Sequence, residues 1–255
     1  MDDASLDHLL AAIQEVVRAR ALPAPRGLPY LGLEHPSGTN LNLLHTLSTR
    51  GIFRKYELVL DVEAGLGATS RWLAQRLGCE VVGTTASARE ALAAGDLARR
   101  ARLAAHSRCV AARSDGLPFR PSRFTHVWMV ETLPRLDDAG RALAEAARVL
   151  RHGGQLAIQD LVLRDEGVGL AIPGWRFQTV EARVAALRHL PLVDVEIHDR
   201  SAEAHERSAA VIAARERLLA ALGRSDQRLT SERVALGDAL AGGLLRVVHI
   251  LARRA

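Results

Sequence analysis

The sequence predicts an α/β fold in which helices cover both faces of a doubly wound, mostly parallel sheet. Between residues 57 and 162, short apolar runs rich in β-branched residues alternate with segments of helical character. The first of these runs ends in the glycine turn Gly65-Leu66-Gly67. Strands that alternate with helices are joined by right-handed crossovers, which place the strands parallel in one sheet. The length of 255 residues suits one large domain, or one domain with a cap.

Two helical segments are expected before the alternating region. Residues 4–20 carry leucine, isoleucine and valine side chains at helical spacing, which predicts an amphipathic helix. A loop rich in proline and glycine follows from Pro23 to Gly38, and residues 40–50 form a second predicted helix. We therefore assign residues 1–50 to an N-terminal helical cap.

Residues 51–163 are expected to form the cofactor-binding core of the fold. The expected strands are residues 57–62, 81–82, 109–111, 124–130 and 155–162, and the expected helices are residues 70–76, 88–104 and 137–150. Their order along the chain is the order that right-handed crossovers require.

The last third of the chain departs from this alternation. A helix is predicted at residues 180–187, a sixth strand at 193–197 and a final strand at 244–251. Residues 202–243 read as two helices separated near Gly223, and this insert is too long for a plain connection. We expect the insert to serve as a lid over a substrate or as a homodimer surface, and assign residues 164–255 to the substrate side of the same domain.

Composition and charge argue against several classes of protein. The chain is 48% hydrophobic and 25% charged, as in ordinary globular domains, and no apolar run is long enough to cross a membrane. Its net charge of +5 would fit a nucleic-acid partner, but Lys55 is the only lysine and the arginines are scattered beside acidic residues. We therefore expect a solvated surface and no nucleic-acid groove.

Cys79 and Cys109 are the only cysteines, too few for a disulfide framework and without the spacing of a metal site. The chain begins Met1-Asp2-Asp3, which is unlike a signal peptide. The expected compartment is a reducing cytoplasm. The scattered histidines predict no metal site.

The turn Gly65-Leu66-Gly67 marks the expected ligand site, because ligands of open α/β sheets bind beyond the carboxyl ends of the strands. A dinucleotide fingerprint would need a third glycine and an acid after the second strand, but the sequence has Ser70 and Thr85 at these places. A phosphate-binding P-loop would need Gly-Lys-Ser or Gly-Lys-Thr, and the sequence has neither. A nicotinamide-dependent oxidoreductase is therefore a weak alternative.

Four segments in order carry a resemblance to a known family. Residues 59–67 read V-L-D-V-E-A-G-L-G, and residues 78–87 read G-C-E-V-V-G-T-T-A-S. The tripeptide Leu117-Pro118-Phe119 precedes F-T-H-V-W at residues 124–128, and residues 147–160 read A-R-V-L-R-H-G-G-Q-L-A-I-Q-D. These segments resemble the class I S-adenosylmethionine (SAM) dependent methyltransferases, in the small-molecule group similar to methyltransferase type 11. The resemblance implies a Rossmann-like, mostly parallel seven-stranded sheet with an antiparallel last strand, and SAM as the cofactor.

The resemblance also implies roles for residues beyond the strand ends. Asp61, Gly65 and Gly67 would line the methionine part of SAM, and Thr85 takes the place that usually holds the ribose-binding acid. Glu131, just after the fourth strand, would face the sulfonium and the acceptor. The implied reaction is direct displacement of the methyl group, in which the protein mainly positions donor and acceptor.

Several cofactor positions depart from the family pattern. Glu63 stands at the usual first glycine of the motif, where its side chain takes space and its charge could repel the SAM carboxylate. Arg113 replaces the usual adenine-binding aspartate, and because arginine has only donors, Asp115 is the candidate substitute. Thr85 offers a weaker, neutral hydrogen bond. These departures leave an alternative open: a methyltransferase-fold protein that has lost methyl transfer and serves another catalytic or partner role.

Candidate acceptor-side residues lie in loops that flank the strand ends. Tyr30 and His35, in the N-terminal loop, are candidate catalytic residues together with Glu131. Residues 130–134 read V-E-T-L-P, which lacks the motif typical of nucleobase amino-methylating enzymes and argues against a nucleic-acid acceptor. The predicted function is methylation of a small molecule, in specialised metabolism.

Overall fold

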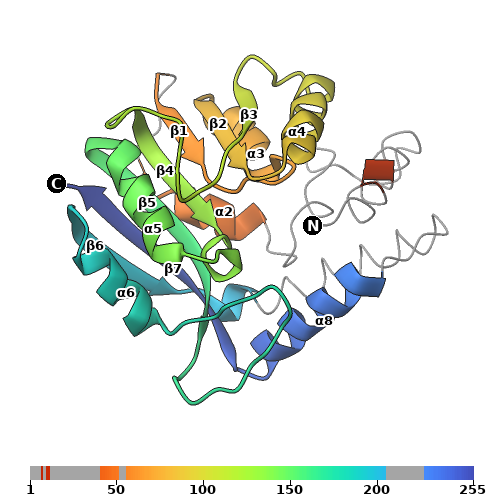
Figure 1. The fold of residues 1–255 in the computed structure, drawn as a ribbon, viewed down its shortest axis with the longest axis vertical. Helices are drawn as coiled ribbons and strands as arrows, with labels where there is room; N and C mark the ends of the chain where they lie inside the picture. Colours follow the sequence, from red (N-terminus) through yellow and green to blue (C-terminus); the bar gives the residue numbers. More distant parts are fainter. Residues whose placement is uncertain (1–6, 8–9, 12–40, 52–55, 205–226) are drawn as a thin grey trace.

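The computed structural model describes residues 7, 10–11, 41–51, 56–204 and 227–255 of the chain. These residues build one seven-stranded sheet in the order β3-β2-β1-β4-β5-β7-β6 (Figure 1). The strands are β1 (Leu58–Asp61), β2 (Glu80–Thr85), β3 (Ser107–Ala111), β4 (Phe124–Val130), β5 (Leu150–Leu163), β6 (Leu192–Asp199) and β7 (Leu245–Arg254). Only β7 runs antiparallel to its neighbours, β5 and β6, among these strands. The predicted Rossmann-like sheet with an antiparallel last strand is confirmed.

Helices pack on both faces of the sheet, and each face has its own apolar cluster. On one face α5 (Ala139–Val149) and α6 (Val180–Arg188) cover the strands, and on the other face α2 (Leu41–Ser48) and α3 (Ala68–Leu77) do so. The first cluster includes Leu60, Val127, Met129, Ile158, Leu143 and Leu187, and the second includes Val59, Trp128, Ala157, Leu44, Leu47 and Leu73. Consecutive strand residues divide between the two clusters because strand side chains alternate between faces.

A third apolar cluster joins the loop after β5 to the C-terminal helix α8 (Gln227–Ala241). Trp175 is 8% exposed and packs with Leu236 and Ala239 of α8. Its indole Nε1 donates a 2.9 Å hydrogen bond to Glu232 Oε1. This arrangement ties the end of the predicted insert to the same side of the molecule as the β5 loop (Figure 1).

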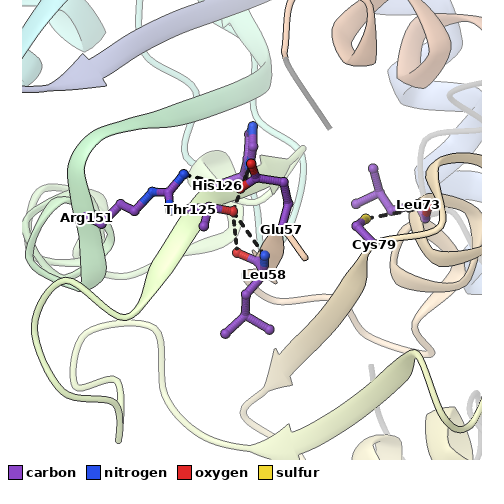
Figure 2. A network of polar contacts seen from close by, with 7 residues as sticks. All are labelled: Glu57, Leu58, Leu73, Cys79, Thr125, His126 and Arg151. Carbon is purple, nitrogen blue, oxygen red and sulfur yellow. Dashed lines mark hydrogen bonds and ion pairs between the residues drawn. The ribbon is translucent and has the colours of Figure 1, made fainter. Parts of the chain in front are cut away.

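A polar network lies at the amino ends of β1 and β4 (Figure 2). The predicted ligand site is at the other, carboxyl ends of these strands. The Thr125 hydroxyl accepts from the Leu58 N–H and donates to the Leu58 carbonyl, each at 3.0 Å, and lies 2.9 Å from His126 Nδ1. The buried Glu57 carboxylate lies 3.4 Å from Arg151 Nη2 and 3.8 Å from His126 Nδ1. Burial outweighs the attraction of Glu57 and lowers the pKa of His126 to about 4, so the ring is neutral at pH 7.

Several element boundaries differ from the sequence predictions, and three of these differences have a clear structural reason. β2 has six residues where two are predicted, because Gly83 interrupts the apolar run and yet pairs with β1 and β3. β5 begins five residues earlier than predicted, at Leu150, because Gly154 lets two backbones approach closely: a Cβ there would lie 2.8 Å from the carbonyl oxygens of Arg151 and Thr125. The helix α4 (Ala88–Arg100) ends early, before Arg102 takes the left-handed conformation.

Two predicted helices are covered only in part by the described residues. Most of residues 4–20 and of the first half of the insert lie outside them, and so do Tyr30 and His35. The division at residues 50 and 163 stays a prediction. In the part of the chain that the structure describes, no helix is long and apolar enough to span a membrane.

Candidate active site

The carboxyl end of β1 holds a buried acid. Asp61 is 1% exposed, and its Oδ2 accepts a 2.6 Å hydrogen bond from the Ser70 hydroxyl in the first turn of α3. Burial raises the pKa of Asp61 to about 7, and the hydrogen bonds from the Ser70 side chain and backbone offset only part of this effect. The carboxyl group is therefore partly protonated at neutral pH.

The turn after Asp61 has a left-handed backbone. The φ angles of Glu63, Gly65 and Gly67 are 55°, 53° and 74°. Glu63 thus keeps the backbone conformation that glycine adopts without strain. Arg71, buried in α3, donates from Nη1 to the Leu66 carbonyl oxygen at 2.5 Å and holds the turn against the helix.

The Glu63 side chain reaches the loops that follow β2 and β3. Burial raises the pKa of its carboxyl group, while hydrogen bonding by the Ser114 side chain and the Ala86 backbone and the charge of Arg135 lower it. Its backbone N–H also lies 3.4 Å from the Thr84 hydroxyl oxygen. The carboxyl group therefore lies where the loops after β1, β2 and β3 meet.

A second acid lies at the end of β2. The Thr85 hydroxyl donates to Glu90 Oε2 at 2.5 Å. Glu90 stands in the first turn of α4, where the N-cap Ser87 accepts from the Glu90 backbone N–H at 3.2 Å. The N-cap thus fixes the first turn of α4, and this turn brings the Glu90 carboxylate next to Thr85. Thr85 stands where the family usually has an acid, so Glu90 supplies a carboxylate near that position.

Arg113 and Asp115 form a bidentate ion pair after β3. Arg113 Nε and Nη2 donate to the two carboxylate oxygens of Asp115 at 2.9 and 2.6 Å. The Arg113 side chain is 73% exposed and that of Asp115 23%. This pairing lowers the pKa of Asp115, which stays ionised at neutral pH with both oxygens engaged.

Glu131 follows β4 at the same edge of the sheet. Its φ is 54°, again in the left-handed region, and its side chain is buried at 4% exposure. The Glu131 N–H donates to the Gln159 carbonyl oxygen at 2.7 Å, and Gln159 Nε2 donates to Glu131 Oε1 at 3.1 Å. Gln159 thus fixes both the backbone and the side chain of this acid.

Comparison with known proteins now places the chain in a family. A family model of a methyltransferase domain matches residues 60–158. Methyltransferase GfsG from Streptomyces halstedii is 30% identical over 190 residues, which cover 71% of this chain and 68% of that protein. The chain belongs to the SAM-dependent methyltransferases. The predicted family and its cofactor, SAM, are confirmed.

Two further relatives extend this result. Tocopherol O-methyltransferase from Arabidopsis thaliana is 31% identical over 54% of the chain, and the match spans 40% of that protein. The crystal structure of the [4+2]-cyclase SpnF has a TM-score of 0.74 at 20% identity and covers 98% of this chain and 94% of that one. Identity this low shows the fold alone. The named sequence relatives are methyltransferases, which confirms the predicted class of enzyme, a methyltransferase of small molecules.

Two residues of this methyltransferase near β5 are structural. Asp160 is fully buried, and its Oδ2 accepts from Arg183 Nε at 2.7 Å, while its Oδ1 accepts from the Leu161 N–H. Trp175 stacks on Phe177 at 5.6 Å between ring centroids. Asp160 therefore anchors α6 to the sheet, and Trp175 packs the C-terminal cluster.

The structure brings the predicted cofactor residues of the methyltransferase to one edge of the sheet. Asp61, Glu63, Gly65, Gly67, Thr85, Arg113, Asp115 and Glu131 all lie at or just beyond the carboxyl ends of β1 to β4. Sequence reasoning missed Glu90, Ser114 and Gln159. For Glu90 a signal was present, since Ser87 and Glu90 have the spacing of a capping box. In the part of the chain that the structure describes, no three His, Cys, Asp or Glu side chains gather as a metal site would require.

Proposed function

We propose that this methyltransferase transfers the SAM methyl group to an oxygen, nitrogen or carbon atom of a small acceptor in specialised metabolism. One observation supports the cofactor part of the proposal above all others: acids from separate elements converge at the carboxyl edge. Burial raises the pKa of the Cys109 thiol to about 12, and the negative charges of Asp61, Glu90 and Glu63 add to this rise. Because all three charges affect the same thiol, these acids lie close to one another around Cys109.

The charge of this edge suits SAM. At neutral pH SAM carries a sulfonium, an ammonium and a carboxylate, so it is a net cation, and clustered carboxylates attract a cation. The turn from Glu63 to Gly67 presents its left-handed backbone beside Asp61. We infer that Asp61 and this turn hold the methionine part of SAM.

The adenosine part of SAM is assigned to the ends of β2 and β3. The Glu90 carboxylate and the Thr85 hydroxyl are in contact at 2.5 Å. We infer that Glu90 accepts hydrogen bonds from the ribose hydroxyls and that Thr85 donates to them. Ser114, Asp115 and Glu63 border the expected adenine position.

Bound SAM supplies an electrophilic methyl group, and the residues of this chain position the acceptor for direct displacement. Glu131 is assigned to the sulfonium and the acceptor, because it is a buried acid that directly follows the carboxyl end of β4. Tyr30 and His35 stay candidate catalytic residues, as predicted from the sequence. An acceptor that must lose a proton needs a base, and these three side chains are the candidates.

Two further predictions belong to this proposal. A reducing cytoplasm fits the two cysteines, Cys79 and Cys109, which are both free thiols. A lid role for the insert is supported by α8, which packs on the loop after β5. A homodimer formed through the insert stays a prediction.

The test is calorimetric titration of the purified protein with SAM and with S-adenosylhomocysteine (SAH), followed by transfer of labelled methyl from SAM to a panel of hydroxylated and amino acceptors. Micromolar binding of both ligands and labelled product would support the proposal. Absence of binding at millimolar SAM would overturn it and would favour the alternative, a repurposed fold, for which Glu63 and Arg113 are the sequence evidence.

A further inference from the structure

A buried row of polar side chains crosses the sheet behind Glu131. Gln159 of β5 pairs in register with Val130 of β4 on one side and with His249 of β7 on the other. Residues in register on neighbouring strands project from the same face of a sheet. Gln159 is 0% and His249 2% exposed, so both polar groups are shielded from water and need partners inside the protein.

The contacts in this row are continuous. Gln159 Nε2 donates to Glu131 Oε1 at 3.1 Å, and His249 Nε2 lies 3.1 Å from Gln159 Oε1. The Glu131 backbone N–H adds a third bond, to the Gln159 carbonyl oxygen at 2.7 Å. Gln159 of β5 therefore connects Glu131, which follows β4, with His249 of β7 on the other side of β5.

The chemistry of the three groups gives the row a direction. An ionised carboxylate only accepts hydrogen bonds, so the Gln159 amide must turn its NH2 group toward Glu131. Its carbonyl oxygen then faces His249, which must donate through Nε2–H. Burial, with the nearby charges of Arg200, His198 and Arg50, lowers the pKa of His249 to about 4, so the ring carries a single proton at neutral pH.

We propose that Gln159 and His249 are positioning residues, which hold the Glu131 carboxylate aimed at the sulfonium of SAM. The proposal rests on the proposed function, because it uses the site assigned to SAM. The left-handed backbone of Glu131 is a conformation that a non-glycine residue keeps only when its surroundings enforce it, and Gln159 bonds to both its N–H and its carboxylate. His249 acts on Glu131 through Gln159, because it donates to the side-chain carbonyl oxygen of Gln159, and this bond keeps the Gln159 amide from rotating by 180°.

The test compares two ligands that differ in one charge. SAM carries the sulfonium and SAH does not, so the ratio of their dissociation constants, Kd(SAH)/Kd(SAM), reports the carboxylate aimed at the sulfonium. Glu131→Gln should lower this charge ratio about tenfold, the usual effect of losing a charged hydrogen-bonding or ion-pairing partner. Gln159→Leu and His249→Leu should each lower it about threefold and leave SAH binding within about twofold of the wild type.

Matched variants separate positioning from stability. His249→Gln keeps an N–H donor for Gln159 and should restore the charge ratio. His126→Leu removes another buried, neutral histidine, at the opposite edge of the sheet, and should destabilise the fold without changing the ratio. An unchanged ratio in Gln159→Leu and His249→Leu, with both ligands still bound, would overturn the inference, whereas loss of both ligands from the wild-type protein would contradict the proposed function instead.

A measurement on the wild-type protein needs no variant to fold. Histidine labelled with ¹⁵N distinguishes the two ring tautomers by NMR, and the His249 signal can be assigned as the one that His249→Gln lacks. The Nε2–H tautomer is expected at pH 7. The Nδ1–H tautomer would mean that the Gln159 amide is turned the other way, and this result would also overturn the inference.

Discussion

The carboxyl group of Asp61 should make SAM binding depend on pH. Its pKa of about 7 arises from burial at the end of β1, where Ser70 gives one short hydrogen bond. If the SAM ammonium binds this carboxyl group, only the ionised form binds well, so the unbound protein must lose a proton first. Affinity is then expected to increase as pH rises toward neutrality.

The size of the effect follows from this pKa. The apparent dissociation constant equals that of the ionised form multiplied by a factor, which is one plus the ratio of protonated to ionised Asp61. This factor is about 11 at pH 6 and about 1.3 at pH 7.5. Binding should therefore tighten about eightfold over this range, with about 0.9 proton released per SAM at pH 6. The range stops below pH 8, because there the α-amino group of the ligand begins to lose its own proton.

Calorimetry in two buffers of different ionisation enthalpy measures both quantities, since the difference in heat gives the number of protons released. Asp61→Asn, which cannot ionise, is the control and should bind weakly with no pH dependence between pH 6 and 7.5. Equal affinity at both pH values in the wild-type protein, with no proton released, would refute the role of Asp61 as the ammonium partner.

Three further predictions concern single positions. Arg183→Met leaves Asp160 buried without its cation and should cost about 3–5 kcal/mol in the free energy of unfolding, measured with denaturant; the double variant with Asp160→Leu should recover much of the loss. Gly83→Ala places a Cβ 2.9 Å from Ala64 Cβ, so it should displace the first turn, cost about 1–3 kcal/mol and weaken SAM binding. Glu90→Gln should weaken SAM binding by roughly threefold to tenfold by calorimetry, because a neutral amide replaces a charged ribose acceptor, and an unchanged affinity would show that Glu90 does not contact the ribose.

The sheet could be predicted from the sequence because its signals are local. β1 and β4 are apolar runs buried on both faces, and such runs stand out from the helices between them. The boundaries of β2 and β5 were harder, since Gly83 and Gly154 resemble turn residues in the sequence. Their roles depend on how closely neighbouring backbones approach, and this appears only when the strands are paired.

The site was predictable where a residue acts through its own strand end, as Asp61 and Glu131 do. Gln159 gave no such signal, because its function depends on neighbours in two other strands: Val130 lies 29 residues before it and His249 lies 90 residues after it. A sequence pattern records spacing along one element. Cross-strand register is set by the whole sheet, and it therefore could not be inferred from the pattern alone.

The departures from the family pattern keep the local geometry of the site. Glu63, at the position of the usual first glycine, has a left-handed backbone, and its carboxyl group joins the acids around Cys109. Arg113 turns toward solvent and pairs with Asp115, so its guanidinium does not add an unpaired positive charge to the edge that should receive a cation. The net charge of +5 therefore says little about this edge, where the acids dominate. A left-handed backbone is not confined to this site, since Arg102, Ser122 and Asp194 also adopt it among the described residues. The convergence of acids from separate elements, and not backbone strain, is therefore the stronger argument for a site that binds a cation.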